Sequence, residues 1–394
     1  MQKGARTIGT TVFLLCITAA LFGDISPHIM SKAAAVYEYE TGTLLYEKNG
    51  DLPIPPASMT KLMTLHLAFK AIESGEIDLN ATVTVEASDD FTQLPRRSSL
   101  MFLEEGQEVT LLQLMQGLAV PSGNDAALML ARLLAGSVDN FVELMNQEVS
   151  ALGYENIYFD DPAGLSEKSY VTAKEFGLFC CEYIRQHPES LKMLHTLSEF
   201  TYPPPGVSSS TYGPITQENY NVLVGRHPWV DGLKTGYIDE SGYNISLTAR
   251  ADGRRLVAVV LGGPGESGRE GALTRAIDGV NLLSYGFYHF TRVEPQFPTL
   301  RSIKVWRGVP NTIQAKIHSP VALVLPLDTA AQIQVRHQLD LPLEAPLEAG
   351  AKIGETLITS GDTVIRSYPI RVPIEVKLGS WWRQLVDSIG QLHQ

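Results

Sequence analysis

Three short groups of polar residues in this chain could together support nucleophilic catalysis. The first is Ser58-Met-Thr-Lys61, the single S-x-x-K in the sequence. Side chains three residues apart on a helix are neighbours, so the lysine amine could take the serine proton once its own pKa is lowered. The apolar residues 62–72 predict that burial. Alone, the motif would also fit an ordinary surface serine and lysine.

The second and third groups lie further along the chain. Ser122-Gly-Asn124 comes just before a helical pattern, where a loop can hold a hydroxyl and an amide toward a cleft. Lys234-Thr-Gly236 leads into a strand-like stretch, and its glycine would let another backbone approach closely. Each group has a simpler interpretation. The serine and asparagine could only cap the helix, and the lysine could simply begin a strand.

The three groups carry more weight together, because each occurs once and in the order S-x-x-K, S-x-N, K-T-G. This trio is typical of penicillin-binding proteins and class A β-lactamases. The chain resembles the low-molecular-mass penicillin-binding proteins, the serine D-alanyl-D-alanine carboxypeptidases of peptidase S11 type. The segments that carry this resemblance are PASMTKLMT at 56–64, RSSLMFLEEGQEVTLLQLMQGL at 97–118, PSGNDAA at 121–127, DPAGL at 161–165, DGLKTGY at 231–237 and GGPGESGRE at 262–270.

The resemblance implies a specific reaction. Ser58 would attack the carbonyl between the two terminal D-alanines of a peptidoglycan stem peptide, with Lys61 as general base. Water would then hydrolyse the acyl-enzyme, and β-lactams would inhibit by acylating the same serine. No cofactor is implied. The other implied roles are proton transfer to the leaving amine by Ser122, an oxyanion hole from the N–H groups of Ser58 and Tyr237, and substrate binding by Asn124, Lys234, Thr235, Gly236 and Arg269.

The sequence departs from the family pattern just after K-T-G, and alternatives stay open. Ile238 stands where threonine is usual and Ser241 where alanine is usual. A β-lactamase is disfavoured, because no E-x-x-L-N segment follows the S-G-N motif. A D,D-endopeptidase or transpeptidase on the same scaffold is an alternative, and so is a non-catalytic envelope protein that binds peptidoglycan.

Composition narrows the classes of partner. The chain of 394 residues has a formal net charge of −12, which argues against nucleic-acid binding. Its nine histidines are scattered, with no H-x-x-x-H pair and no cluster of cysteine and histidine, so we predict no metal site. Cys180 and Cys181 are adjacent and are expected to be small core residues.

Periodicity predicts an α+β fold for residues 33–293, in which helices cover an antiparallel sheet. Two hairpins are expected, one around 33–50 and one formed by 242–249 and 255–262, with Asp252-Gly253 at its turn. A small all-β domain, a β-sandwich, is expected at 296–377. The expected helices are 58–72, 111–119, 125–135, 139–152, 172–187 and 272–290.

Both ends of the chain point to the cell envelope. Lys3 and Arg6 precede an apolar run at 8–22, which predicts a signal peptide within residues 1–32 and export to the periplasmic or extracytoplasmic face of the cytoplasmic membrane. An uncleaved anchor is the alternative. The spacing in residues 380–394 predicts an amphipathic helix with Trp381 and Trp382 on its apolar side, and such a helix would be a peripheral membrane anchor. The same side could instead pack on the β domain.

Overall fold

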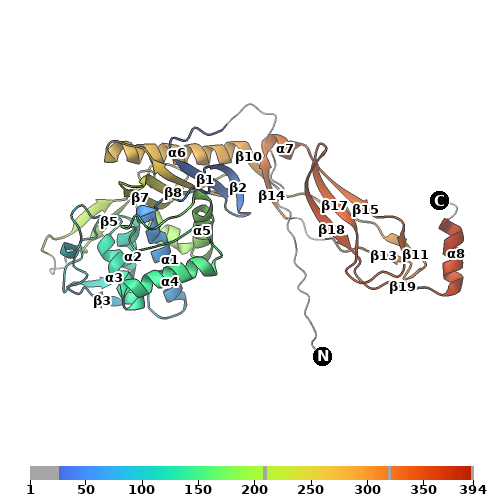
Figure 1. Cartoon of the computed structure of the whole chain (residues 1–394), viewed down its shortest axis with the longest axis horizontal. Coiled ribbons are helices and arrows are strands. Elements are labelled where there is room, and N and C mark those ends of the chain that lie inside the picture. Colours follow the sequence, from blue (N-terminus) through green and yellow to red (C-terminus); the bar gives the residue numbers. More distant parts are fainter. Residues whose placement is uncertain (1–25, 207–210, 318–320, 392–394) are drawn as a thin grey trace.

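The computed structural model describes residues 26–206, 211–317 and 321–391 (Figure 1). Its main sheet has five antiparallel strands in the order β2-β1-β9-β8-β7. Asp252 and Gly253, with φ of 50° and 74°, form the predicted turn between the adjacent strands β8 and β9. The strands are β1 (Ala33–Glu38), β2 (Thr43–Lys48), β7 (Val230–Ile238), β8 (Gly242–Ala251) and β9 (Arg254–Gly263).

The sheet is buried on both faces, which explains why its central strands are apolar throughout. In β1, Ala35 and Tyr37 join one hydrophobic core while Ala34 and Val36 join the other. Side chains alternate between the faces of a strand, so a strand covered on both faces needs apolar residues at every position.

Helices cover the two faces unequally. One long helix, α6 (Gly268–His289), packs on β8 and β9, and five earlier helices form a larger layer on the opposite face (Figure 1). Ser267 caps α6 by accepting from the Glu270 N–H, so this helix begins four residues before the predicted start. The larger layer contains α1 (Lys61–Glu73), α2 (Leu111–Ala119), α3 (Asn124–Ala135), α4 (Val138–Ala151) and α5 (Ala173–Gln186).

Short elements surround this helical layer. The β3-β4 and β5-β6 pairs are small antiparallel ribbons that connect the helices. Their bounds and those of the short helices are β3 (Thr82–Thr84), β4 (Glu108–Thr110), β5 (Glu199–Tyr202), β6 (Ile215–Glu218), η1 (Ala57–Thr60), η2 (Phe91–Gln93) and η3 (Leu191–His195).

The C-terminal part is built mainly from short strands, as predicted, with the five-residue helix α7 among them. Its first strand, β10, follows α6 directly and pairs with β14. The elements are β10 (Phe290–Val293), β11 (Ile303–Trp306), β12 (Gly308–Val309), β13 (Thr312–Ile313), β14 (Leu323–Pro326), α7 (Leu327–Ala331), β15 (Ile333–Leu339), β16 (Leu343–Glu344), β17 (Lys352–Ser360), β18 (Thr363–Arg371), β19 (Lys377–Leu378) and α8 (Trp381–Gln391).

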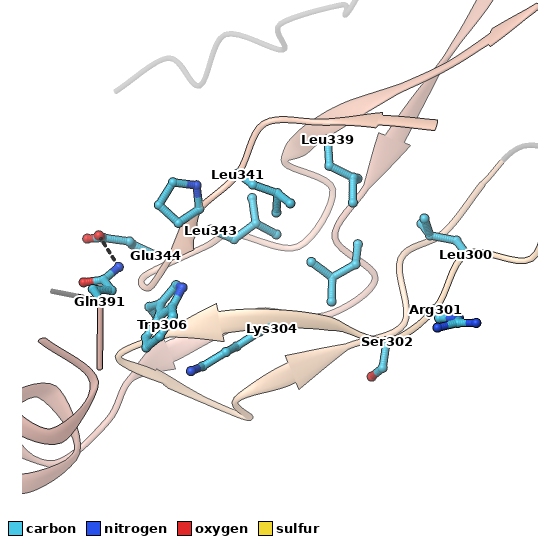
Figure 2. A pocket seen from close by; sticks show the side chains of 12 residues that line it. Leu300, Arg301, Ser302, Lys304, Trp306, Leu339, Leu341, Leu343, Glu344 and Gln391 are labelled. Carbon is cyan, nitrogen blue, oxygen red and sulfur yellow. Dashed lines mark hydrogen bonds between the residues drawn. The ribbon is translucent and has the colours of Figure 1, made fainter. Parts of the chain in front are cut away.

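The final helix, α8, lies at the far end of this part (Figure 1). Figure 2 shows how its last residue is held: the Gln391 amide donates to Glu344 Oε1 at 2.8 Å, beside a groove of about 750 Å³ between β11 and the segment 339–344. Over the described ranges, no helix combines the length and hydropathy needed to cross a membrane.

The predicted signal segment lies mostly outside the described residues. Its last residues do not: Ser31 is buried, and the Lys32 N–H donates to the Gly262 carbonyl at 3.3 Å. These residues therefore belong to the folded body.

Candidate active site

Ser58 lies in η1, a 3₁₀ turn that packs against β7, the edge strand of the main sheet. The helix predicted from residue 58 begins as this 3₁₀ turn and becomes α-helical at Lys61. Ala57, with φ of 51°, turns the chain just before the serine. The edge strand β7 comes so close that a Cβ on Gly236 would lie 2.4 Å from the Pro56 carbonyl oxygen and 3.1 Å from Ser58 N. The glycine of K-T-G is therefore required by the packing of β7 against the serine.

Lys61 is fully buried, and its Nζ contacts three oxygen atoms. Its Nζ lies 2.9 Å from Ser58 Oγ, 2.7 Å from Asn124 Oδ1 and 2.6 Å from the carbonyl oxygen of Ala163. Burial lowers the pKa of Lys61 to about 7, although Asp161 and Asp125 oppose the shift. An amine with this pKa can accept a proton near neutral pH, as the sequence predicted for this position.

The Ala163 carbonyl is presented by the DPAGL loop. Asp161 shapes the loop, since its carboxylate accepts from the backbone N–H groups of residues 163–166 at 2.6–3.1 Å. The preceding carbonyl, that of Pro162, accepts from Thr64 Oγ1 on α1 at 2.7 Å. The loop is thus attached to the helix that carries Lys61.

Ser122 lies in the turn between α2 and α3 and is held in the left-handed region, with φ of 60°. Gly123 follows it because no larger residue fits: a Cβ there would lie 2.9 Å from Met101 N. The Asp125 carboxylate fixes the same neighbour by accepting from the backbone N–H groups of residues 101–103. The segment around Met101 is therefore the support of the S-G-N turn.

Asn124 does not cap α3, so the capping interpretation was wrong. Gly123 is the N-cap, without a side-chain cap, and Asn124 is the first helical residue. Its side-chain oxygen accepts from Lys61 and its exposed fraction is only 3%.

Lys234 completes the cluster from β7. Its Nζ donates to Ser122 Oγ at 2.9 Å and to the Thr235 carbonyl at 3.1 Å. Burial lowers its pKa well below the usual value, and the neighbouring Lys61 and Arg275 add to the shift. Three basic groups in one buried region favour the binding of an anion such as a carboxylate.

Comparison with known proteins decides the family. A profile described as D-alanyl-D-alanine carboxypeptidase matches residues 22–265, and one described as the C-terminal domain of penicillin-binding protein 5 matches residues 298–377. The chain is 31% identical to the D-alanyl-D-alanine carboxypeptidase DacA of Escherichia coli over 92% of this chain and 88% of that protein. The chain belongs to the D-alanyl-D-alanine carboxypeptidase family.

Solved structures agree with this assignment. The crystal structure of penicillin-binding protein 5 from Haemophilus influenzae matches with a TM-score of 0.75 and 29% identity, over 90% of this chain and all of that one. Penicillin-binding protein D2 from Listeria monocytogenes, in its ampicillin-bound form, matches with a TM-score of 0.54 and 28% identity, over 66% of this chain and 98% of that one. The predicted fold class, a transpeptidase-like α+β domain followed by an all-β domain, is confirmed, and the chain is an enzyme of the carboxypeptidase class.

Two residues to which the family resemblance gives a substrate role have exposed side chains, Tyr237 and Arg269. Tyr237 is half exposed, and its hydroxyl donates to Asp239 Oδ1 at 2.6 Å, which raises the pKa of the phenol to about 12. Arg269 is exposed on the first turn of α6. A hollow of about 480 Å³ lies beside that turn, lined by residues of α6, by residues 217–220 and by Val222.

Arg275 is a residue that sequence reasoning missed. It is buried on α6, and its guanidinium donates to the carbonyls of Gly236 and Asn244 at 3.1 and 3.3 Å. Burial lowers its pKa to about 10. One arginine thus ties α6 to β7 and β8 behind the K-T-G motif, and no local motif would have identified it.

The departure at Ser241 has a structural role in the family scaffold. Its Oγ accepts from Asn244 Nδ2 at 3.2 Å, and the same amide donates to the Pro55 carbonyl at 2.9 Å. This amide joins β8 to the segment just before the nucleophile. Serine therefore takes part in the support of Ser58 at a position where the family usually has alanine.

Proposed function

We propose that this enzyme removes the terminal D-alanine from peptidoglycan stem peptides through an acyl-enzyme on Ser58. Lys61 takes the hydroxyl proton as the oxygen attacks the carbonyl carbon of the penultimate D-alanine. Ser122 delivers a proton to the leaving amine, and water then hydrolyses the ester. The N–H groups of Ser58 and Tyr237 stabilise the oxyanion.

The observation that carries this proposal is the set of three contacts at Lys61 Nζ. A neutral amine has two N–H donors and one lone pair. The two shorter contacts, to Asn124 Oδ1 and the Ala163 carbonyl, use both donors because those oxygens carry no proton to give. The lone pair is then left for the Ser58 hydroxyl at 2.9 Å, the orientation that a general base needs.

Other residues than the nucleophile and its base would bind the substrate. We assign the substrate amide to Asn124 and the terminal carboxylate to Thr235, Arg269 and the positive potential of Lys234. A carboxylate beside Lys234 would restore the proton that burial disfavours. Gly236 allows the peptide backbone to approach β7.

The family assignment fits β-lactams as inhibitors, a peptidoglycan substrate and a location outside the cytoplasm. The decisive test is mass spectrometry of the intact protein after benzylpenicillin, with the adduct mapped by digestion. One adduct at Ser58 is expected, lost in Ser58→Ala and retained in Ser302→Ala, an exposed serine of the β domain. An adduct on Ser58→Ala would overturn the proposal.

A second assay separates carboxypeptidase from transpeptidase. The enzyme is incubated with a pentapeptide ending in D-Ala-D-Ala, with and without an added D-amino acid. We expect release of one D-alanine per peptide and no product that contains the added amino acid. Incorporation as the main outcome would identify a transpeptidase.

We also propose that α8 binds the membrane surface peripherally. The helix is held to the β domain by its polar side, since buried Asp387 accepts from the Arg307 N–H at 2.7 Å. Its apolar side chains face outward, with exposed fractions of 65% for Trp381 and 60% for Trp382, whose rings stack 4.3 Å apart. The polar side of α8, and not its apolar side, therefore packs on the β domain. An exposed apolar side suits a helix that lies in the membrane interface.

Flotation with anionic phospholipid vesicles tests the anchor. The variant Trp381→Ser/Trp382→Ser should lose most vesicle binding, and Leu341→Ser/Ile374→Ser, which removes two other exposed apolar side chains, should keep it. Equal binding by both variants would contradict an anchor in α8.

A further inference from the structure

One buried histidine, His195, contacts the strand of the K-T-G motif and has no part in the mechanism proposed above. It is the last residue of η3, a five-residue π-helical turn that packs against β7 and α2. Its Nδ1 lies 3.3 Å from the Leu233 carbonyl oxygen, and its Nε2 lies 2.9 Å from the Tyr183 hydroxyl on α5. The exposed fractions of the histidine and the tyrosine are both 0%. The imidazole therefore joins α5 to the residue that precedes Lys234.

The protons of these two contacts follow from the chemistry of the partners. A backbone carbonyl can only accept, so the hydrogen bond to Leu233 requires the imidazole proton on Nδ1. A neutral imidazole then has its lone pair on Nε2, and the Tyr183 hydroxyl donates to it. Burial lowers the pKa of His195 to about 3, and the charge of Lys234 adds to the shift. The imidazole is therefore neutral near pH 7 and is held in one tautomer.

The turn η3 contacts both chain segments that carry the catalytic cluster. The backbone of β7 comes so close that a Cβ on Gly232 would lie 3.1 Å from His195 Cβ. On the side of α2, Gln116 Nε2 donates to the Met193 carbonyl at 3.3 Å. Because α2 leads into the turn that holds Ser122, η3 lies against the supports of both the S-G-N and the K-T-G motifs.

The peptide group between Leu233 and Lys234 is held at both of its polar atoms. Its oxygen accepts from His195, and its N–H donates to Ser246 Oγ on β8 at 3.3 Å. The lysine side chain that follows must reach Ser122 Oγ at 2.9 Å. Lys234 is only 1% exposed, so dense packing restricts its rotamers and Nζ cannot compensate for a rotated peptide. The orientation of this peptide group therefore decides where the ammonium group lies.

We propose that His195 is a positioning residue for Lys234 and, through it, for recognition of the terminal carboxylate of the substrate. The hydrogen bond from Nδ1 keeps the peptide group in the orientation that directs Nζ toward Ser122. The hydroxyl of Tyr183 keeps the proton on the nitrogen that faces Leu233. This inference rests on the role proposed above for Lys234 in carboxylate binding.

A purely structural role for His195 makes a different prediction. If the histidine only stabilised η3 and the core, its replacement would change the reaction with every acylating compound to the same extent. If it positions Lys234, replacement should slow the reaction selectively with compounds that carry the carboxylate. The ratio of two acylation rates therefore distinguishes the two roles.

Benzylpenicillin and its methyl ester provide this comparison. Both acylate through the same β-lactam carbonyl, but only the acid carries a carboxylate beside the ring nitrogen that leaves on acylation. Rates of adduct formation are measured by mass spectrometry of the intact protein. Wild type should react at least about tenfold faster with the acid, the effect of one charge-assisted interaction. This ratio of acid to ester is the measure of carboxylate recognition.

Two amide variants separate the two nitrogens of the imidazole. In His195→Asn, the amide nitrogen takes the position of Nδ1 and can still donate to Leu233. In His195→Gln, the amide takes the position of Nε2 and can reach only Tyr183. The Asn variant should keep the ratio within about twofold of wild type, and the Gln variant should lower it about tenfold. The thermal midpoint should fall in both, because each leaves one buried group without its partner.

Leu194→Val is the control for a general loosening of η3. Leu194 is fully buried in the same turn, so the smaller side chain should lower the thermal midpoint through lost packing and leave the ratio of acid to ester unchanged. Equal ratios in His195→Asn and His195→Gln, or a ratio lowered as much in Leu194→Val as in His195→Gln, would overturn the positioning role.

Failure of this inference is distinguishable from failure of the proposed function. If wild type shows no preference for the acid, the carboxylate role of Lys234 is wrong and the positioning role of His195 is wrong with it, while the adduct on Ser58 remains. If no adduct forms on Ser58, the acyl-enzyme mechanism itself is wrong.

Discussion

Gly164 packs directly against Ala57, the residue before the nucleophile: a Cβ on Gly164 would lie 1.9 Å from the Ala57 carbonyl oxygen and 2.9 Å from Ser58 N. Its φ of +79° already favours glycine. The DPAGL loop thus sets the position of the nucleophilic turn from one side while its Ala163 carbonyl binds Lys61 from the other. Nucleophile and base are held by the same five residues.

Substitution of Gly164 by alanine should therefore slow acylation by about 100-fold. The added methyl must displace η1, and a shift of about 1 Å at a reacting atom can cost about 100-fold in rate. Gly153→Ala is the matched control, because Gly153 has the same φ of +79° and no atom within 4 Å of the new Cβ. It should lose only about 1 kcal/mol of stability through backbone strain. Acylation rates with fluorescent penicillin and thermal midpoints are measured for both variants. Equal acylation rates would contradict the claim that Gly164 positions the nucleophilic turn.

Acylation should fall below neutral pH with the protonation of Lys61. Only the neutral amine can take the Ser58 proton, and burial lowers its pKa from the usual 10.5 to about 7. The active fraction is therefore nearly complete above about pH 8 and decreases about tenfold per pH unit below about pH 7. Second-order acylation by benzylpenicillin, followed by mass spectrometry from pH 5 to 8.5, measures this. A rate independent of pH over that range would argue that Lys61 is not the base.

The sequence predicted well whatever depends on local spacing. The three motifs, the Asp252-Gly253 hairpin and the bounds of α2 follow from residues that are neighbours in the chain. Ser58, Lys61, Ser122, Asn124 and Lys234 meet in one buried cluster, as the order of the motifs indicated.

The supporting residues could not be predicted in this way. Arg275, Asp125 and Asn244 act through backbone groups that are distant in sequence, and their types alone would equally suit a surface. The error over Asn124 has the same origin. A helix cap is a local interaction of the side chain with nearby backbone. The Asn124 side chain instead accepts a hydrogen bond from the buried amine of Lys61, which is 63 residues away in the sequence.

Arg269 should contribute to the recognition of the terminal carboxylate. Loss of one charge-assisted hydrogen bond in Arg269→Gln is expected to lower kcat/KM for a peptide ending in D-Ala-D-Ala by about tenfold. Because the side chain is exposed, the thermal midpoint should not move. Arg250→Gln, at another exposed arginine, is the control. An unchanged kcat/KM in Arg269→Gln would remove this residue from the proposed site.

Signal cleavage should occur before Ile29, earlier than the limit of residue 32 expected from sequence. The carboxylate of Asp278 on α6 is fully buried and accepts from the Met30 N–H at 3.0 Å, and from the N–H and Oγ of Ser31 at 2.8 and 2.5 Å. If cleavage removed Met30 and Ser31, the buried Asp278 carboxylate would lose these three hydrogen bonds. The folded state would then be less stable by about 3–5 kcal/mol.

Mass spectrometry of the exported protein should therefore find Met30 and Ser31 retained. A chain that starts at Lys32 should melt lower than one that starts at Ser26. In Asp278→Asn, the two chains should differ less in thermal midpoint. A buried neutral amide without these hydrogen-bond donors destabilises the fold less than a buried carboxylate without them. If both starts melt alike, the residues before β1 do not stabilise the fold through Asp278.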